Sequence, residues 1–427
     1  MRIKNFEQLA TTPLRKQALL IAEAGLDAVD TARVIERILQ YERLEDRLTV
    51  DGVDYDLKTF KRTIIIGFGK AAFTAVEAIQ EKLGARITCG FVIDIKGGDL
   101  GTEISCRIGT HPLPTMVNVQ ATQELIDLLS SCTEDDLVMC VVSGGGSSLL
   151  CMPHEMTCEA ESIIIKQLTK LGANIQELNT VRKHISKVKG GQLAKICYPA
   201  TMVNIIFSDV PDGDISMVAS GPTVLDTTTM HDAAEILKQY TILDLCQLPS
   251  CSLIETPKDS KYFEKVNNVL AVSSDMLLRA CREKGRDLGF TVRTFSTGFQ
   301  GEAASLGREF LAATSTGTCL LAVGESTVHV RGKGKGGRNQ EMALAALALL
   351  NEGQVLLALA TDGADNTEVA GAMVDVQTQR RAKSLGLDAG QYVADNNSYT
   401  FFQEVGDYID TGITGTNVAD LVICLRE

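Results

Sequence analysis

Short apolar runs that end in glycine-rich turns and lead into helical stretches constrain the fold of this chain most strongly. Thr63–Ile66 is rich in β-branched residues, ends in Gly67-Phe68-Gly69 and precedes a helical pattern from Lys70 to Leu83. Strands that alternate with helices in this way predict parallel α/β sheets, in which ligands bind beyond the carboxyl ends of the strands. Further strands are expected at 90–94, 137–142, 203–207, 269–272, 289–295, 318–323 and 354–360, and helical spacing extends over the first 45 residues.

This alternation occurs in two regions of the chain. Between them, from Thr223 to Ser260, the pattern weakens, and Pro249 and Pro257 suggest a boundary. A chain of 427 residues is long for one hydrophobic core and long enough for two. We therefore expect two α/β domains with a cleft between them, at residues 1–245 and 260–427.

The charge balance limits the classes of partner. The chain carries 41 basic and 54 acidic residues, a net charge of −13, which disfavours a protein that coats nucleic acid or an anionic membrane. No apolar run reaches the roughly 18 residues of a membrane span, and the N-terminal segment has no hydrophobic export signal. The 12 cysteines form no C-x-x-C pair. We expect a cytoplasmic protein with reduced thiols and small-molecule partners.

The first candidate site is the turn between Thr63–Ile66 and the helix that follows it. Gly67 and Gly69 let the backbone approach an anion closely, and the N-terminus of the helix offers free N–H groups. Lys70 adds a fixed cation that suits a phosphoryl oxygen or a carboxylate. With Asp94 after the next strand, the turn also fits an incomplete dinucleotide-binding fingerprint. A tight turn without a ligand is the simpler alternative.

A second glycine-rich turn, Ser143-Gly144-Gly145-Gly146-Ser147-Ser148, follows the run at 137–142. Successive N–H groups in such a turn form an anion-binding nest, and its hydroxyl groups supply further donors. The turn lacks the lysine of a P-loop and the spacing of a nucleophile elbow. An ordinary turn is again the alternative.

Cations cluster in the next stretch, Ile163–Leu193, which is expected to be helical. Arg182, Ser186 and Lys189 are three or four residues apart and would share one helical face. Anion binding is one interpretation of this face, and a solvated basic surface is the other.

Two strand ends carry carboxylates. Asp209, Asp212 and Asp214 follow one predicted strand, and Asp362 and Asp365 follow another. Carboxylate oxygens suit Mg²⁺, which commonly takes one or two of them together with phosphate oxygens. A solvated turn rich in aspartate is the alternative.

The most basic segment is Val330–Glu341, which follows Glu325 and contains four cations and four glycines before an Ala/Leu-rich helix. Glycines give a ligand access to the backbone, while lysine and arginine neutralise a transferring phosphate. A polar, glycine-spaced loop, Thr411–Asn417, lies near the C-terminus. Together these strand ends hold the cations, amide nests and paired carboxylates that phosphoryl transfer from a metal-bound nucleotide to a small acid requires.

Several segments, in this order, resemble the glycerate 2-kinase family that has a C-terminal MOFRL domain and is also labelled hydroxypyruvate reductase. The resemblance covers nearly the whole chain. Its segments are GFGKAA (67–72), HPLP (111–114), SGGGSSLL (143–150), LNTVRKHISKVKGGQLA (178–194), SDVPDGDISMVASGPT (208–223), VRGKGKGGRNQEMALA (330–345) and TGTNVADL (414–421).

This resemblance implies a larger N-terminal Rossmann-like domain and a smaller C-terminal α/β domain of the MOFRL type. It implies transfer of the γ-phosphoryl group of ATP, with Mg²⁺, to the 2-hydroxyl of D-glycerate, giving 2-phosphoglycerate and ADP. Reduction of hydroxypyruvate by NAD(P)H is the alternative, which the partial fingerprint at Gly67 supports. A homodimer stays open as an assembly, and neither nucleic acid nor a membrane is an expected partner.

Carried onto this sequence, the resemblance assigns Lys70 and Arg338 as catalytic cations that bind the glycerate carboxylate or the transferring phosphoryl group. Asp209, or in second place Asp362, would hold Mg²⁺ or accept the hydroxyl proton. Substrate or phosphate binding is expected at Gly67, Gly69, Ser143, Gly144, Gly145, Gly146, Ser147, Arg182, Lys189, Glu325, Lys335, Asn339, Thr414 and Asn417.

Overall fold

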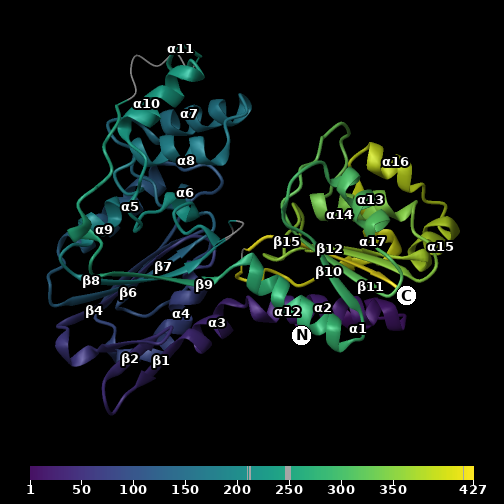
Figure 1. The fold of residues 1–427 in the computed structure, drawn as a ribbon, viewed down its shortest axis with the longest axis horizontal. Helices are drawn as coiled ribbons and strands as arrows, with labels where there is room; N and C mark the ends of the chain where they lie inside the picture. The colour runs from purple at the N-terminus through teal and green to yellow at the C-terminus, as the bar shows by residue number, and fades with distance from the viewer. Residues whose placement is uncertain (209, 211–212, 246–251, 417) are drawn as a thin grey trace. The chain divides into compact units, whose positions relative to one another are not determined.

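The computed structural model describes residues 1–208, 210, 213–245, 252–416 and 418–427. The chain forms two compact units, each built on its own six-stranded sheet (Figure 1). The first unit is Val34–Val272, and in the second Met1–Arg33 joins Ser273–Glu427. The expected α/β class with two domains is therefore what the chain adopts. The predicted ranges, 1–245 and 260–427, differ from these units in residues 1–33 and in the strand at 266–272, and as domain boundaries they stay a prediction.

The first unit holds a fully parallel sheet with the strand order β6-β5-β4-β7-β8-β9. Numbered along the chain, this order is 3-2-1-4-5-6, that of a doubly wound sheet whose order reverses between its first and fourth strands. Each of the five runs predicted between 63 and 272 lies within one of these strands. The strands are β4 (Arg62–Phe68), β5 (Cys89–Asp94), β6 (Ile104–Ile108), β7 (Asp136–Ser143), β8 (Thr201–Phe207) and β9 (Val266–Val272).

Helices cover both faces of this sheet (Figure 1). Ile64, Ile66 and Phe68 alternate along β4 and share one core with side chains of the covering helices on their face. Gly67 points the other way, where an added Cβ would lie 3.2 Å from Val76 of α4. The helices are α4 (Ala72–Leu83) on one face, and α5 (Met116–Ser130), α6 (Gly146–Leu149) and α9 (Gln192–Cys197) on the other.

The predicted continuous helix over 163–193 is wrong. Gly172, with φ +84°, follows the first helix there, and Asn174 starts the next with a capping box, in which its side chain and that of Glu177 bond each other's backbone N–H. Gly190 and Gly191 also have positive φ angles. The segment is thus divided among α7 (Cys158–Lys170), α8 (Ile175–His184) and α9, and α7 and α8 share a small apolar core with α10 (Met230–Gln239) and α11 (Ile242–Leu245).

The second unit holds a mixed sheet with the strand order β10-β11-β15-β12-β13-β14, in which β10 and β11 are parallel and all other neighbours are antiparallel. The last strand in sequence, β15, inserts between β11 and β12 and separates them. The three runs predicted between 289 and 360 correspond to β10, β11 and β12. The strands are β10 (Thr291–Phe299), β11 (Thr318–Gly324), β12 (Gln354–Ala360), β13 (Gly371–Val374), β14 (Tyr408–Ile409) and β15 (Asp420–Arg426).

Residues from both ends of the chain build this unit (Figure 1). Arg15 is fully buried, and its guanidinium pairs with Asp375 at 3.0 Å and with Asp407 at 2.5 Å. This double ion pair links the helix that contains Arg15 to the C-terminal part of the chain. One face of the sheet packs on α2 (Pro13–Ala28) and α12 (Ser274–Asp287). The other face shares an apolar core with α13 (Ala303–Ala313), α14 (Arg338–Leu347), α15 (Val376–Ser384), α16 (Ala389–Ala394) and α17 (Ser398–Val405).

Helical spacing over the first 45 residues is only partly confirmed. After α1 (Phe6–Leu9), α2 and α3 (Thr31–Ile38), the chain turns into an antiparallel three-stranded sheet. Its strands are β1 (Leu39–Glu42), β2 (Arg47–Val50) and β3 (Val53–Asp56). The hairpin pairing of Leu39 with Val50 overrides the local spacing. Within the described residues, the helices are all too short or too polar to cross a membrane.

Candidate functional site

Lys70 lies at the point where the order of the first sheet reverses. It follows β4, and its backbone N–H donates to the carbonyl oxygen of Gly144, after β7, at 2.9 Å. Gly69 permits this approach because its φ is +118° and an added Cβ would lie 2.5 Å from the carbonyl oxygen of Ser143. Ligands of doubly wound sheets bind at this switch point. Within the described residues, the Lys70 ammonium has no carboxylate at ion-pair distance.

The N–H groups of the turn after β4 are already used inside the protein. Gly69 donates to Ile93 at 3.1 Å, Ala71 donates to the Ser143 hydroxyl at 3.1 Å, and Phe73 donates to Asp94 at 2.9 Å. The Asp94 carboxylate thus occupies the N-terminus of α4, where a dinucleotide fingerprint would place a pyrophosphate. The structure gives Gly67 and Gly69 a shaping role in this turn.

The turn after β7 is different, because its amides are available. The N–H groups of Gly144, Gly145, Gly146 and Ser147 donate to no acceptor in the described part of the chain. Gly145 has a φ of +80°, and an added Cβ there would lie 3.1 Å from the Lys70 side chain. The predicted nest and the predicted cation are therefore next to each other.

His111 also lines this nest, and our sequence analysis did not select it. Its ring lies about as close to Gly145 as Lys70 does, with an added Cβ 3.2 Å from His111 Cδ2. Burial and the charge of Lys70 lower the pKa of His111 to about 4, so the imidazole is neutral at pH 7. The Ser148 hydroxyl donates to Pro112 at 2.7 Å and holds this loop in place. The HPLP segment was the sequence feature that pointed here.

A strained loop closes the nest on its other side. Ala219 and Ser220 have φ angles of +50° and +62°, a region in which non-glycine residues are uncommon. An added Cβ at Gly146 would lie 2.8 Å from the Ala219 methyl group, so only glycine fits there. The Ser220 hydroxyl donates to Asn179 of α8 at 2.7 Å and lies 3.3 Å from the Ser147 hydroxyl.

The structure does not place Arg182 and Lys189 on one helical face, because α8 ends at His184. Lys189 is buried, and its ammonium pairs with buried Glu161 at 2.8 Å. Arg182 lies three residues after Asn179 on α8 and has no carboxylate at ion-pair distance among the described residues. Burial lowers the pKa of Arg182 from its ordinary value, against the opposing effect of Glu161. Arg182 is thus the cation of this pair that a ligand can use.

In the second unit, Arg338 begins α14 and is held by two carboxylates. Asp420, at the start of β15, accepts two bonds from one edge of the guanidinium, from Nε at 2.6 Å and from Nη2 at 3.1 Å. The Nη1 atom contacts Glu325, whose side chain is 70% exposed. Although burial opposes it, these two carboxylates raise the pKa of Arg338. Burial raises the pKa of Asp420 to about 6. Our sequence analysis did not select Asp420.

Asp365 fixes the N-terminus of α14 from outside the helix. Its buried carboxylate accepts the N–H groups of Asn339 at 3.1 Å and Gln340 at 2.8 Å. The Asn339 side chain also bonds Asp365, at 3.2 Å. Asp365 supplies the cap that Gly337, as N-cap residue, has no side chain to provide. Asn339 and Asp365 thus bond each other and cap the helix that begins at Arg338.

The basic loop before α14 is extended and alternates in exposure. Three of its glycines, at 332, 334 and 336, face the segment 395–398, and Gly337 faces Asp365. Gly334 donates to the carbonyl oxygen of Asp395 at 2.9 Å. Its cations all lie on the exposed side. The Lys335 ammonium pairs with Glu368 at 3.0 Å and lies 4.1 Å from the centre of the Tyr399 ring. The exposed cations are Arg331, Lys333 and Lys335.

The remaining predicted residues fall into two groups. Asp362 accepts the Ala364 N–H at 3.0 Å through Oδ1, and the Thr414 hydroxyl donates to Thr361 at 2.6 Å. Asp209 and Asn417 lie outside the described residues. In the rest of the chain, no three His, Cys, Asp or Glu side chains converge to hold a metal ion. Asp362 therefore offers one carboxylate oxygen, which fits Mg²⁺ only if phosphate oxygens complete its ligands.

Comparison with known proteins identifies both parts of the chain. Residues 17–250 match a domain of unknown function, DUF4147, and residues 318–420 match the MOFRL family. A Thermotoga maritima protein named D-glycerate 2-kinase is 34% identical over 96% of this chain and 98% of its own length. A protein from Agrobacterium vitis, named provisionally as a hydroxypyruvate reductase, is 35% identical over 84% of this chain and 86% of its own length. A crystal structure described as glycerate kinase from Thermotoga maritima superposes with a TM-score of 0.80 at 32% identity, covering 96% of this chain and 99% of that one.

Proposed function

We propose that this chain, which belongs to the glycerate kinase family built from DUF4147 and MOFRL domains, transfers the γ-phosphoryl group of ATP to the 2-hydroxyl of D-glycerate. The observation that carries the proposal is that Lys70 lies beside four backbone amides that donate to no acceptor among the described residues, at the switch point of a doubly wound sheet. This arrangement binds a multiply charged oxyanion, and the family supplies the identity of the reaction.

In this proposal Lys70 and the Gly144–Ser147 amides hold an anionic group of the reactants. Backbone donors and a fixed ammonium stabilise charge that develops on phosphoryl oxygens, and they need little reorganisation during the reaction. Neutral His111 lies beside Lys70 and adds no competing positive charge. Arg182, a half-buried cation without a carboxylate partner among the described residues, is proposed to bind the same class of group.

Arg338 is proposed as the second catalytic cation. Asp420 occupies one edge of its guanidinium and fixes the plane of the group. The exposed Glu325 carboxylate contacts the remaining Nη1 atom, where it stands in for a substrate carboxylate or phosphoryl oxygen. An anionic substrate group would replace Glu325 at Nη1 without disturbing Asp420. Lys335, on the exposed side of the basic loop, is proposed to bind phosphate.

The chemistry of the step is a simple displacement. The 2-hydroxyl oxygen of D-glycerate forms a bond to the γ-phosphorus while the bond to the bridging oxygen breaks, and ADP leaves with that electron pair. We propose Asp209 as acceptor of the hydroxyl proton or as a Mg²⁺ ligand, with Asp362 as the second candidate. Bound Mg²⁺ would neutralise part of the phosphate charge.

The alternative, reduction of hydroxypyruvate by NAD(P)H, has less support. The sequence feature that best supports it is the partial fingerprint at Gly67, which needs a free N-terminus of α4 for the pyrophosphate. In the structure, however, the Asp94 carboxylate accepts the N–H of Phe73 at this N-terminus, at 2.9 Å. A pyrophosphate at that helix would meet a carboxylate.

An ADP-release assay with D-glycerate and MgATP tests the proposal, alongside NADH consumption with hydroxypyruvate. We expect ADP release that depends on D-glycerate, and a loss of kcat of about 10²–10³-fold in Lys70→Met and Arg338→Met, as for lost transition-state charge stabilisation. Lys96→Met is the matched control, because this lysine follows the neighbouring strand β5 and its ammonium bonds Thr74 at 2.7 Å. NADH consumption without ADP release would overturn the proposal.

A further inference from the structure

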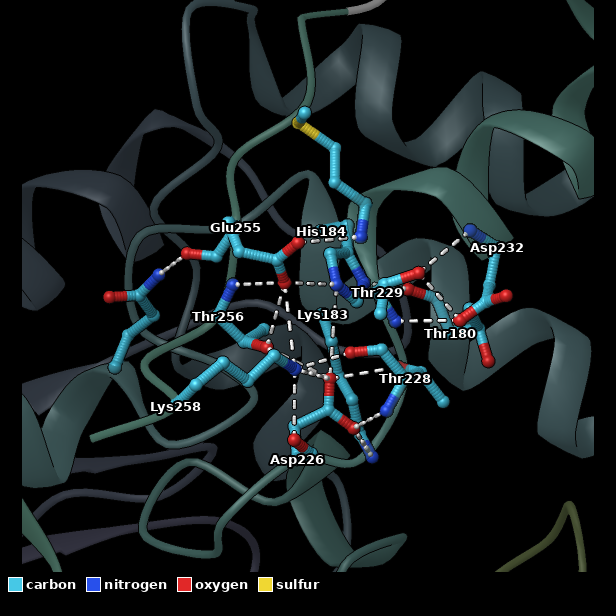
Figure 2. Close-up of polar contacts among 12 residues, drawn as sticks. Thr180, Lys183, His184, Asp226, Thr228, Thr229, Asp232, Glu255, Thr256 and Lys258 are labelled. Carbon is cyan, nitrogen blue, oxygen red and sulfur yellow. Dashed lines mark hydrogen bonds and ion pairs between the residues drawn. The ribbon is translucent and has the colours of Figure 1, made fainter. Parts of the chain in front are cut away.

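The first unit contains a buried polar network around Lys183, His184 and Asp226 (Figure 2). Its centre is Asp226, which is 3% exposed. One carboxylate oxygen of Asp226 pairs with the Lys183 ammonium at 3.0 Å, and the other accepts hydroxyl groups from Thr228 at 2.8 Å and Thr256 at 3.1 Å. The Lys258 ammonium donates to the Asp226 carbonyl oxygen at 2.9 Å. Asp226 thus joins α8, the loop before α10 and the segment that leads to β9.

The network is closed rather than open to a ligand. His184 bonds the carbonyl oxygen of Thr180 at 2.9 Å and Glu255 at 3.2 Å, so both of its ring nitrogens are used. Lys183 and Asp226 are both buried and opposite in charge. A buried network whose polar groups are all hydrogen-bonded holds its side chains rigidly, and it leaves no donor or acceptor free to bind a substrate.

The network is connected to the nest by short stretches of backbone. Lys183 directly follows Arg182, and Asp226 lies six residues after Ser220. Between them, the N–H groups of Gly190 and Gly191 donate to the carbonyl oxygens of Ser220 and Gly221 at 2.9 and 2.8 Å. Gly190 makes room for this contact, because an added Cβ would lie 2.7 Å from the Thr256 methyl group.

We propose that Asp226 is a positioning residue: through its ion pair with Lys183 and its bonds to Thr228 and Thr256, it sets Arg182 and the strained Ser220 loop in the geometry that binds the anionic reactant. The proposal rests on the proposed kinase function, because Arg182 is assigned there to anion binding. Asp226 itself touches no reactant. Replacing it by Asn should therefore act through Arg182.

The first unit contains a matched control for this ion pair. Arg62 and Asp136 form a fork with N–O distances of 2.8 and 2.6 Å, and Asp136 is 1% exposed. They are the first residues of β4 and β7, at the amino ends of the strands, opposite the nest. Asp136→Asn removes the charge of an equally buried aspartate in the same unit, although its partner Arg62 is 31% exposed, and it leaves the Asp226 network untouched.

The test is a double-mutant cycle in steady-state kinetics with Arg182→Ala, Asp226→Asn and both together. We expect Asp226→Asn to raise the same KM that Arg182→Ala raises, by about tenfold, with kcat changed much less, as for lost ground-state binding. The double variant should match Arg182→Ala within about twofold, because coupled residues are not additive. Thr228→Val, which removes one bond to Asp226, gives a smaller KM rise and serves if Asp226→Asn does not fold. Multiplied effects in the double variant, or an equal KM rise in Asp136→Asn, would overturn the proposal.

A second readout needs no activity. If the wild-type chain releases no ADP with D-glycerate, the proposed function fails and hydrogen exchange decides the positioning role. Asp226→Asn should speed exchange of the Gly190 and Gly191 amides, and Asp136→Asn should leave them unchanged. Unchanged exchange of these two amides in Asp226→Asn would refute the positioning role of Asp226.

Discussion

Gly69→Ala tests whether the approach of the two glycine-rich turns builds the Lys70 site. Gly69 has a φ of +118°, and an added Cβ would lie 2.5 Å from the carbonyl oxygen and 2.8 Å from the carbonyl carbon of Ser143. Both atoms belong to the backbone of a central strand, so neither can rotate away. Ordinary contact between carbon atoms is about 3.5–4.0 Å. The turns must therefore separate by roughly 1 Å.

The cost has two parts. Forcing a residue with a Cβ into a left-handed backbone costs about 1–2 kcal/mol, and overpacking a tight contact costs about 1–3 kcal/mol. Together these predict a loss of about 2–5 kcal/mol. Gly172→Ala separates the two parts, since Gly172 has a φ of +84° and nothing within 4 Å of an added Cβ. It should lose only the backbone part, about 1–2 kcal/mol.

Urea unfolding of the two variants and the wild type measures these losses. The separation of the turns should also break the bond from Lys70 N–H to Gly144, so Gly69→Ala should lose most of its ADP-release activity, whereas Gly172→Ala should keep it. Equal losses of stability in the two variants, with full activity in Gly69→Ala, would refute the reasoning.

Three further predictions concern charge. Since the pKa of His111 is about 4 in the folded chain and about 6.5 in an unfolded one, only the unfolded chain takes up this proton between these pH values. The free energy of unfolding should therefore fall as the pH drops from about 6.5 to about 4, and His111→Gln should show a smaller fall; an unchanged slope in urea titrations would contradict this. The ionised carboxylate of Asp420 orients Arg338, and the pKa of Asp420 is about 6. The kcat/KM of the wild type should therefore decline below pH 6, whereas that of Asp420→Asn should be low at all pH values and show no such decline. Arg15→Met leaves Asp375 buried without its cation and leaves Asp407 with Arg381 alone, so it should destabilise the second unit by about 3–5 kcal/mol in thermal or urea unfolding; a loss below about 1 kcal/mol would show that the ion pairs of Arg15 do not hold α2.

Strands and their glycine-rich ends could be predicted because they depend on local sequence. The β-branched run Thr63–Ile66 packs on both faces, so its composition alone marks a central strand. Lys70 and the turn Ser143–Ser148 follow such strands directly, and parallel strands bring their carboxyl ends to one edge. The sequence therefore sufficed to bring these two elements of the candidate site together.

Residues that depend on distant partners could not be predicted. Asp420 accepts a hydrogen bond from Arg338, which lies 82 residues earlier in the sequence. The Asp94 carboxylate accepts the N–H of Phe73 in α4 instead of facing a ligand. Lys189 has the spacing of a helical face shared with Arg182, but α8 ends at His184, and Lys189 pairs with buried Glu161 instead. Arg15 looks like a surface arginine of a helix until its two buried carboxylates are known.

The most direct test of the central claim is a ³¹P NMR spectrum of the purified protein incubated with D-glycerate and MgATP. The account predicts a new phosphomonoester signal that matches 2-phosphoglycerate and grows as ADP appears. Lys70→Met should produce this signal far more slowly, and Lys96→Met at the wild-type rate. A 3-phosphoglycerate signal, or no new phosphoester from a folded protein, would contradict the claim.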